Sequence, residues 1–425
     1  MAAPRAEAGR PASPLPLPMN PTHRPLHQPE TYDLTGGAGT PIPPTRRRAA
    51  AREALASAPG EEDSSHADKL VMLLRQALDE KASDVHLRAG SPPRLRIDGE
   101  LYQVKGFTPS EEVMWRFFKR MLRADQIEIF ERTHELDFSH GLEGFCRIRV
   151  NLYLERGQFC AAIRLIPERI PTMEDIKLPA ACQKLTELSK GLVLVTGPTG
   201  SGKSTTLAAL IDYINATRRC HILTIEDPIE YYYEDRKALV TQRELDLDTL
   251  SFGAALRHSF RQDPDVVLLG EMRDAETMQI AITLAETGHL TFSTLHTGDC
   301  TQTLTRIIDA FPPHQQDQIR SQLALSLVAV ISQRLLKVKN KRGRIAAREI
   351  MICNRAIRNL IREGKYNQLF SAIQTGTEEG MITMDASLNR LVNEGLVDYR
   401  TALEVASDPR EFAGRHGGRG VEEPL

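Results

Sequence analysis

Apolar and polar residues alternate along the chain with two different periods, and these periods predict where helices and strands lie. Between residues 67 and 81, apolar side chains recur at helical spacing, at Leu70, Leu73, Leu74 and Ala77. Shorter segments with strand-like alternation follow, and turn residues separate them. This mixture of helices and antiparallel strands predicts a small α+β domain over residues 66–166.

Each segment of this domain has its own predicted element. Helices are expected at 67–81, 110–122 and 124–132. Strands are expected at 83–87, 94–97, 102–104, 136–140, 144–154 and 158–165.

The pattern changes again after residue 166. Residues 167–179 contain three prolines and are predicted to form an interdomain linker. Helical and strand-like segments then alternate, which predicts an α/β domain over residues 180–345 with a parallel sheet. Its strands are expected at 192–196, 221–225, 266–270 and 290–293, with a helix at 206–214.

Both ends of the chain have a different composition. Residues 1–65 are rich in Pro, Ala, Arg and Gly and are predicted to be a disordered extension. From residue 317 to about 406 the pattern becomes largely helical, which predicts a helical C-terminal region over residues 346–410. Residues 411–425 are expected to be a flexible tail.

Composition and charge exclude several classes of protein. The 425 residues carry a formal net charge of −2, so no overall basic field indicates nucleic-acid binding. No apolar run approaches the roughly 20 residues that span a bilayer, and the first residues lack the apolar core of a secretory signal. The six cysteines are scattered without zinc-site spacing, which favours reduced thiols in the cytoplasm.

One segment carries a strong chemical signal. Residues 192–207 read LVLVTGPTGSGKSTTL, in which Gly197, Gly202, Lys203 and Ser204 satisfy the G-x-x-x-x-G-K-[ST] pattern between a strand and a helix. Glycines let backbone N–H groups approach phosphate oxygens, and the helix start adds partial positive charge. The predicted ATP site consists of Gly197, Pro198, Thr199, Gly200, Ser201, Gly202, Lys203, Ser204 and Thr205. Lys203 would contact the β- and γ-phosphates, and the Ser204 hydroxyl would bind Mg²⁺.

Two acidic segments complete the predicted nucleotide site. The apolar strand in DVVLLGEMRD ends at Gly270 and Glu271, a position from which a carboxylate reaches Mg²⁺ through water. Another strand, in HILTIEDPIEY, ends at Glu226 and Asp227. A carboxylate there suits a general base for the attacking water.

The sequence does not decide the roles of several histidines and arginines outside these segments. His289 and His296 bracket a predicted strand, and their spacing is compatible with either a catalytic or a structural role. Arg147 and Arg149 alternate with apolar residues, so both are expected on one sheet face, either solvated or facing a phosphate.

Taken together, these segments resemble a known family. GPTGSGKST, ILTIEDPIEY, RQDPDVVLLGEMRDAET and ETGHLTFSTLHT occur in this order and are similar to the boxes of the secretion ATPases of type II secretion and type IV pili. The segment AIRNLIREGKYNQLFSAIQTGTEEGMITMDASL resembles the C-terminal region of PilT-type pilus retraction ATPases. The resemblance implies a PAS-like N-terminal domain followed by a RecA-like P-loop ATPase domain.

The resemblance also implies roles for individual residues. By family position, Glu226 is the general base, Glu271 the second carboxylate, and His289 and His296 sense the γ-phosphate. Arg149 and Arg164 match N-terminal arginines that reach the nucleotide, in part across a subunit boundary. The family forms homohexameric rings, so we expect a cytoplasmic ATPase held at the inner membrane by a pilus platform protein, without direct insertion.

Two departures from the family pattern affect the functional prediction. The Pro-rich extension has no counterpart in the compact retraction ATPases, and its role stays open. The four-cysteine zinc insertion of assembly and type II ATPases is absent from the sequence. A hexameric ATPase that drives pilus retraction and twitching motility is therefore the leading prediction. An ATPase of pilus assembly or type II secretion, an accessory paralogue, a nucleic-acid motor and a non-hydrolysing adaptor are the alternatives.

Overall fold

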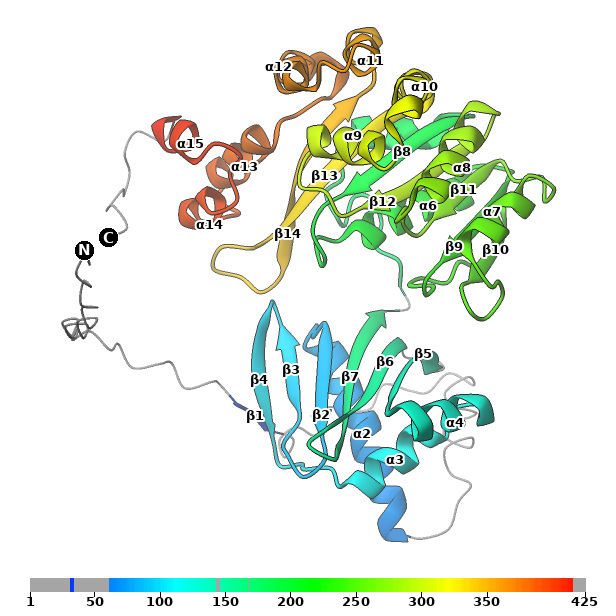
Figure 1. Ribbon diagram of the computed structural model, residues 1–425. Helices are drawn as coiled ribbons and strands as arrows, with labels where there is room; N and C mark the ends of the chain where they lie inside the picture. Colours follow the sequence, from blue (N-terminus) through cyan, green and yellow to red (C-terminus); the bar gives the residue numbers. More distant parts are fainter. Residues whose placement is uncertain (1–30, 34–60, 143–145, 168, 416–425) are drawn as a thin grey trace, which may run out of the picture.

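A computed structural model of the protein describes residues 31–33, 61–142, 146–167 and 169–415, and it contains two seven-stranded sheets. Figure 1 shows the first sheet with its helices as one body and the second sheet with its helices as another. The linker after residue 167 connects the two bodies. Each sheet has its own buried apolar core.

The first sheet is mostly antiparallel, in the order β1-β4-β3-β2-β7-β6-β5. Its strands are β1 (Thr31–Asp33), β2 (Asp84–Arg88), β3 (Arg94–Ile97), β4 (Glu100–Lys105), β5 (Glu135–Leu142), β6 (Cys146–Glu155) and β7 (Gln158–Pro167). Its helices are α2 (Glu61–Asp79), α3 (Glu111–Lys119) and α4 (Ala124–Thr133). Alternation gives β6 one apolar face that includes Ile148 and Val150, and this face is buried together with Phe118 of α3.

The second sheet has the order β10-β9-β11-β12-β8-β13-β14, and only β14 is antiparallel to its neighbour. Its strands are β8 (Gly191–Thr196), β9 (His221–Glu226), β10 (Leu239–Glu244), β11 (Val266–Leu269), β12 (Leu290–Leu295), β13 (Leu327–Lys337) and β14 (Arg344–Ile352). Every residue of β8, β11 and β12 is buried, as expected for strands covered on both faces.

Helices cover both faces of this second sheet. Helices α5 (Ala180–Lys184) and α6 (Lys203–Thr217) share a core with one face. Helices α7 (Phe252–Ser259), α8 (Ala275–Glu286), α9 (Cys300–Asp309) and α10 (Pro313–Ser326) share a core with the other. The chain ends in α11 (Arg355–Arg362), α12 (Leu369–Thr375), α13 (Met384–Asn393), α14 (Tyr399–Leu403) and α15 (Pro409–Arg415).

The structure confirms each predicted strand and helix of the two sheets within a few residues, except for the earlier start of α2, but it corrects the prediction for the C-terminal part. The segment after residue 317 is not largely helical, because β13 and β14 form a long antiparallel pair within it. The predicted helical region from residue 346 therefore begins inside a strand. The β-branched residues of LVAVIS, at the start of β13, favour a buried strand over a helix.

The N-terminal extension also differs from its prediction where the structure describes it. Residues Thr31–Asp33 form β1, which pairs in parallel with β4, so these three residues are ordered. Helix α2 begins at Glu61, earlier than predicted. The predicted flexible tail over residues 411–425 is also corrected at its start, because residues 411–415 belong to a helix, Pro409–Arg415, in which Phe412 is buried. The rest of the predicted extension and residues 416–425 lie outside the described residues.

The β13–β14 hairpin contacts the first sheet. Figure 1 shows its tip directed toward the edge that carries β3 and β4. Lys337 pairs with Glu100 at 2.6 Å, and Arg342 pairs with Glu80 at 2.5 Å. The hairpin thus connects the two bodies in addition to the linker.

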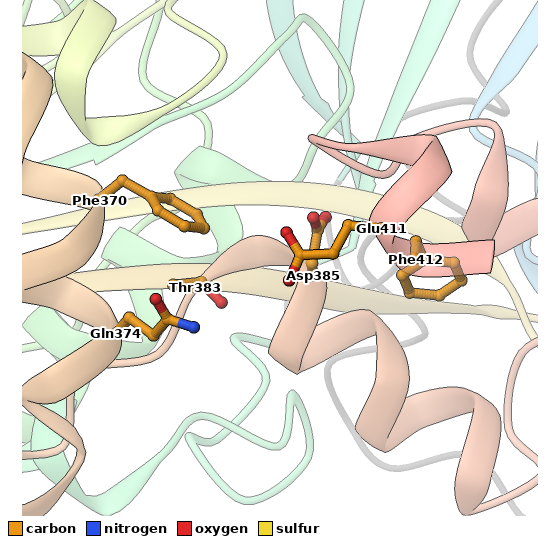
Figure 2. A pocket seen from close by; sticks show the side chains of 6 residues that line it. All are labelled: Phe370, Gln374, Thr383, Asp385, Glu411 and Phe412. Carbon is orange, nitrogen blue, oxygen red and sulfur yellow. The ribbon is translucent and has the colours of Figure 1, made fainter. Parts of the chain in front are cut away.

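A small cavity lies between the C-terminal helices (Figure 2). Its lining residues are Phe370, Gln374, Thr383, Asp385, Glu411 and Phe412. The Asp385 carboxylate accepts hydrogen bonds from the backbone N–H groups of Ser407 and Asp408, at 2.7 and 3.2 Å. Asp385 therefore holds the chain between α14 and α15, which is a structural role.

Candidate nucleotide-binding site

The predicted phosphate-binding loop connects the end of β8 to the start of α6, as the sequence pattern requires. Gly197 has φ of 141°, and a Cβ there would lie 2.3 Å from the carbonyl oxygen of Gln333. Gly202 has φ of 86°, so both positions favour glycine. The loop leaves the carboxyl end of a parallel strand, where α/β folds bind ligands.

Lys203 points back into this loop. Its Nζ donates to the carbonyl oxygens of Gly197, at 2.9 Å, and Pro198, at 3.2 Å. Burial lowers the pKa of the Lys203 ammonium, while the charge of Glu230 acts in the opposite direction. The ammonium therefore lies where backbone groups and a phosphate would compete for it.

The predicted general base lies at the same edge of the sheet. Glu226 is the last residue of β9 and is 8% exposed. Its Oε1 accepts hydrogen bonds from the Thr224 hydroxyl, at 2.7 Å, and the Gln242 amide, at 3.3 Å. Burial raises the pKa of Glu226 to about 7, although both hydrogen bonds lower it. A carboxyl group with such a pKa is suited to accept a proton near neutral pH.

Glu271 and His296 contact each other. Glu271 follows β11 and His296 follows β12, and Nε2 of His296 lies 3.0 Å from Oε2 of Glu271. Burial lowers the pKa of His296, with additional contributions from the charges of Lys203 and Arg273. Arg273 also forms an ion pair with Glu271. The phosphate-binding loop, Glu226, Glu271 and His296 therefore meet where parallel strands β8, β9, β11 and β12 end.

His289 lies elsewhere. It precedes β12, whereas His296 follows it, and seven residues of extended strand span roughly 20 Å. Its Nδ1 lies 3.0 Å from the carbonyl oxygen of Leu284, and its ring packs edge-on against Phe260. Within this chain the structure does not bring His289 to the other predicted site residues.

Of the predicted arginines, two stay on the first sheet and one reaches the second. Arg149 and Arg164 face each other across β6 and β7, and Arg164 pairs with Asp84 on the first sheet at 3.1 Å. Neither has a contact with the phosphate-binding loop in the described part of the chain. Arg147 instead reaches the second sheet, where its Nη2 lies 2.7 Å from Oε2 of Glu244.

Arg147 marks a contact that sequence reasoning did not identify. Its guanidinium lies 4.3 Å above the ring centre of Tyr232, and its side chain is almost fully buried. Oε2 of Glu244 also accepts the backbone N–H of Ile229, at 3.2 Å, just beyond the Glu226–Asp227 turn. The available signal was the alternation of Arg147 with apolar residues, but it does not distinguish Arg147 from Arg149.

The residues at this edge provide oxygen ligands suited to Mg²⁺. Ser204 lies in the first turn of α6, and Glu271 follows β11, which β12 separates from β8 in the sheet. No group of three or more His, Cys, Asp or Glu side chains in the described ranges is arranged to hold a metal ion by itself. A hydroxyl and one carboxylate are instead typical of Mg²⁺ bound together with substrate phosphates and water.

Comparisons with known proteins identify the family of this chain. Residues 60–402 match the family model described as type II/IV secretion system protein. The chain is 47% identical over 340 residues to the type IV pilus retractation ATPase PilT of Pseudomonas aeruginosa, covering 80% of this chain and 98% of that protein. It is 46% identical over 344 residues to the twitching motility protein of Neisseria gonorrhoeae, covering 81% of this chain and 92% of that protein.

A solved structure gives the same result. The crystal structure of the pilus retraction motor PilT with bound ADP has a TM-score of 0.72 and 44% identity, and the match covers 80% of this chain and 97% of that chain. No helix in the described parts of this chain combines the length and apolar character needed to cross a membrane. By family model, sequence identity and fold, this chain belongs to the type II/IV secretion system protein family.

Proposed function

We propose that this protein is a P-loop ATPase that couples ATP hydrolysis to type IV pilus retraction and hence to twitching motility. The observation that carries the proposal is the phosphate-binding loop with Glu226, Glu271 and His296 at one sheet edge. This arrangement occurs in a chain that is 47% identical to a pilus retraction ATPase along nearly the whole of that relative.

The binding step follows from the geometry of the loop. Backbone N–H groups of residues 197–205 and the start of α6 would surround the β-phosphate of ATP. Lys203 would exchange its two carbonyl contacts for phosphate oxygens, because a full negative charge attracts the ammonium more strongly than a dipole does. The Ser204 hydroxyl and Glu271, through water, would hold Mg²⁺, which would supply positive charge to offset the charge of the phosphates.

The hydrolytic step requires a base and compensation of charge. Glu226 would take a proton from water as the water oxygen forms a bond to the γ-phosphorus and the bond to the bridging oxygen breaks. ADP and phosphate are the products. His296, held by Glu271, would contact the γ-phosphate side. Arg149, Arg164 and His289 do not reach this edge within one chain, so we propose that they act across a subunit boundary.

The proposal also covers the oligomeric state of the protein and its location in the cell. We propose a homohexamer in which the first sheet of each subunit, with a PAS-like fold, closes on a RecA-like domain. The domain limits predicted above, with a linker at residues 167–179, belong to this proposal. The ring would be cytoplasmic and held at the inner membrane through a pilus platform protein, without binding nucleic acid.

Hydrolysis by the purified protein tests the enzymatic part. Lys203→Ala is expected to remove ATP hydrolysis while the fold and oligomeric size remain those of the wild type. Full activity in this variant would contradict the assigned site. Stimulation of the wild type by DNA would instead support a nucleic-acid motor.

A deletion strain tests the cellular part. Loss of a retraction ATPase is expected to leave cells with excess pili that do not retract and to abolish twitching. Cells without pili would indicate an assembly ATPase, and a defect in protein secretion with normal pili would indicate a type II system.

A further inference from the structure

Strand β13 places a buried amide against the phosphate-binding loop. Ser332 of β13 pairs with Thr196, the last residue of β8, so the next residue along β13 lies beside the loop that leaves β8. That residue is Gln333, which is 1% exposed. A fully buried glutamine requires partners for both its oxygen and its nitrogen.

Both partners come from the loop and the helix that follows it. Nε2 of Gln333 donates to the carbonyl oxygen of Ser201 at 2.7 Å. Oε1 of Gln333 accepts from the Thr206 hydroxyl at 2.9 Å. The main-chain oxygen of Gln333 lies against Gly197, so this single residue contacts the start of the loop, its middle and the helix that follows it.

These contacts require the chemistry of a primary amide. The glutamine amide carries a donor group, NH₂, and an acceptor, the carbonyl oxygen, at the same distance from the backbone, and the two contacts use one of each. A glutamate would oppose the Ser201 carbonyl with a second acceptor, and a methionine would satisfy neither group. Because Ser201 and Thr206 are themselves buried, a lost partner would leave a polar atom without a hydrogen bond.

We infer that Gln333 is a positioning residue that holds the phosphate-binding loop in the conformation that receives nucleotide phosphates. The inference rests on the proposed function, since it assigns a role within that site. Gln333 acts through Ser201 and Thr206 and has no direct role toward the reacting atoms. The loop surrounds the β-phosphate, which ATP and ADP share, so Gln333 supports the binding of both.

The effect has a specific kinetic signature. Contacts to the β-phosphate are similar in the bound substrate and in the transition state, so weakening them raises KM with little change in kcat. For Gln333→Met we expect KM for ATP and Kd for ADP to rise about tenfold or more, the size typical of lost buried hydrogen bonds. We expect kcat to change less than about threefold.

The experiment uses the full chain and five variants. Gln333→Met and Gln333→Glu remove or disturb the amide that contacts Ser201 and Thr206. Thr206→Val removes only the hydrogen bond between Thr206 and Gln333. Thr206→Ser retains the hydroxyl and is expected to keep KM close to that of the wild type. Gln374→Met makes the same substitution at an exposed site on α12 and controls for the loss of an amide. Steady-state ATP hydrolysis gives KM and kcat, and a fluorescent ADP analogue gives Kd.

The outcomes separate this inference from the proposed function. Unchanged KM and Kd in Gln333→Met, or a fall in kcat alone, would overturn the positioning role. If Gln333→Met and Gln333→Glu fail to fold, the two Thr206 variants test the positioning role. Equal KM values for Thr206→Val and Thr206→Ser would also overturn this role. Absence of ATP hydrolysis and ADP binding in the wild type would instead reject the proposed function itself.

Discussion

The most informative single residue is Glu226, because its environment sets the pH at which it can act. Its pKa is raised to about 7, mainly by burial. A general base works only when ionised, so kcat/KM for ATP is expected to fall as the pH drops through about 7 and to approach a plateau above pH 8. Rates of ATP hydrolysis measured between pH 5.5 and 9 test this dependence.

Glu226→Gln gives the corresponding test by substitution. The amide keeps the size of the side chain but accepts no proton, so hydrolysis is expected to fall by at least about 100-fold. ADP binding should remain within about threefold of the wild type, because Glu226 does not belong to the phosphate-binding loop. A Glu226→Gln variant that kept the wild-type rate, with the same fall in rate at low pH, would exclude Glu226 as the base.

Sequence reasoning identified the residues of this site to different degrees. Local patterns place Glu226, Glu271 and His296 at strand ends and Lys203 after the loop that leaves a strand, and parallel strands bring such ends to one edge. The same patterns do not show that Arg147 faces Glu244, which is 97 residues away in the chain. The patterns do not indicate Gln333 either, since only the pairing of β13 with β8 brings it to the loop.

At the scale of whole elements, the β13–β14 pair was the main failure of prediction. The apolar run in β13 follows α10 directly, and its length alone does not distinguish a buried helix from a buried strand, so its β-branched residues are the local signal for a strand. Its pairing with β8, which is distant in sequence, makes this run a strand. Strands such as β8 and β11 were easier because turn residues and a motif delimit them.

Strand β14 also fixes the start of helix α9, through Glu349. Oε1 of Glu349 accepts the backbone N–H of Cys300, the first residue of α9, at 2.8 Å. Glu349→Ala would leave this buried N–H without a partner, so we expect a loss of about 1–3 kcal/mol of unfolding free energy. Denaturant unfolding of the purified variant measures this loss.

Glu349→Gln isolates the contribution of charge. Burial raises the pKa of Glu349 above its ordinary value of 4.5. As pH rises above about 4.5, the unfolded chain therefore releases this proton before the folded protein does, and the wild type loses stability relative to the variant. Glu349→Gln should retain the hydrogen bond and gain stability relative to the wild type between pH 4.5 and 8. A constant difference across this range would mean that the Glu349 pKa is not raised by folding.

At the scale of the whole molecule, contacts between the two bodies differ strongly in burial. Lys337–Glu100 and Arg342–Glu80 bring the hairpin to the first sheet, and three of their four side chains are more than half exposed. Exposed ion pairs of this kind are worth at most about 1 kcal/mol. The Arg147–Glu244 pair has side chains only 8% and 11% exposed, so breaking it leaves a buried charge. We therefore expect a movement of the first sheet to affect the second sheet mainly through the contact between Arg147 and Glu244.

Hydrogen exchange at the acidic turn can measure this communication. Glu244 holds the backbone N–H of Ile229, so loss of Arg147 should release Glu244 toward solvent and weaken that bond. In nucleotide-free protein we expect Arg147→Ala to speed exchange of the Ile229 amide about tenfold or more, since each 1.4 kcal/mol changes an opening equilibrium tenfold. Lys337→Ala removes an exposed contact between the same two bodies and should leave this amide unchanged. Equal acceleration in both variants would indicate general loosening, and no acceleration in Arg147→Ala would show that the turn is held independently of the first sheet.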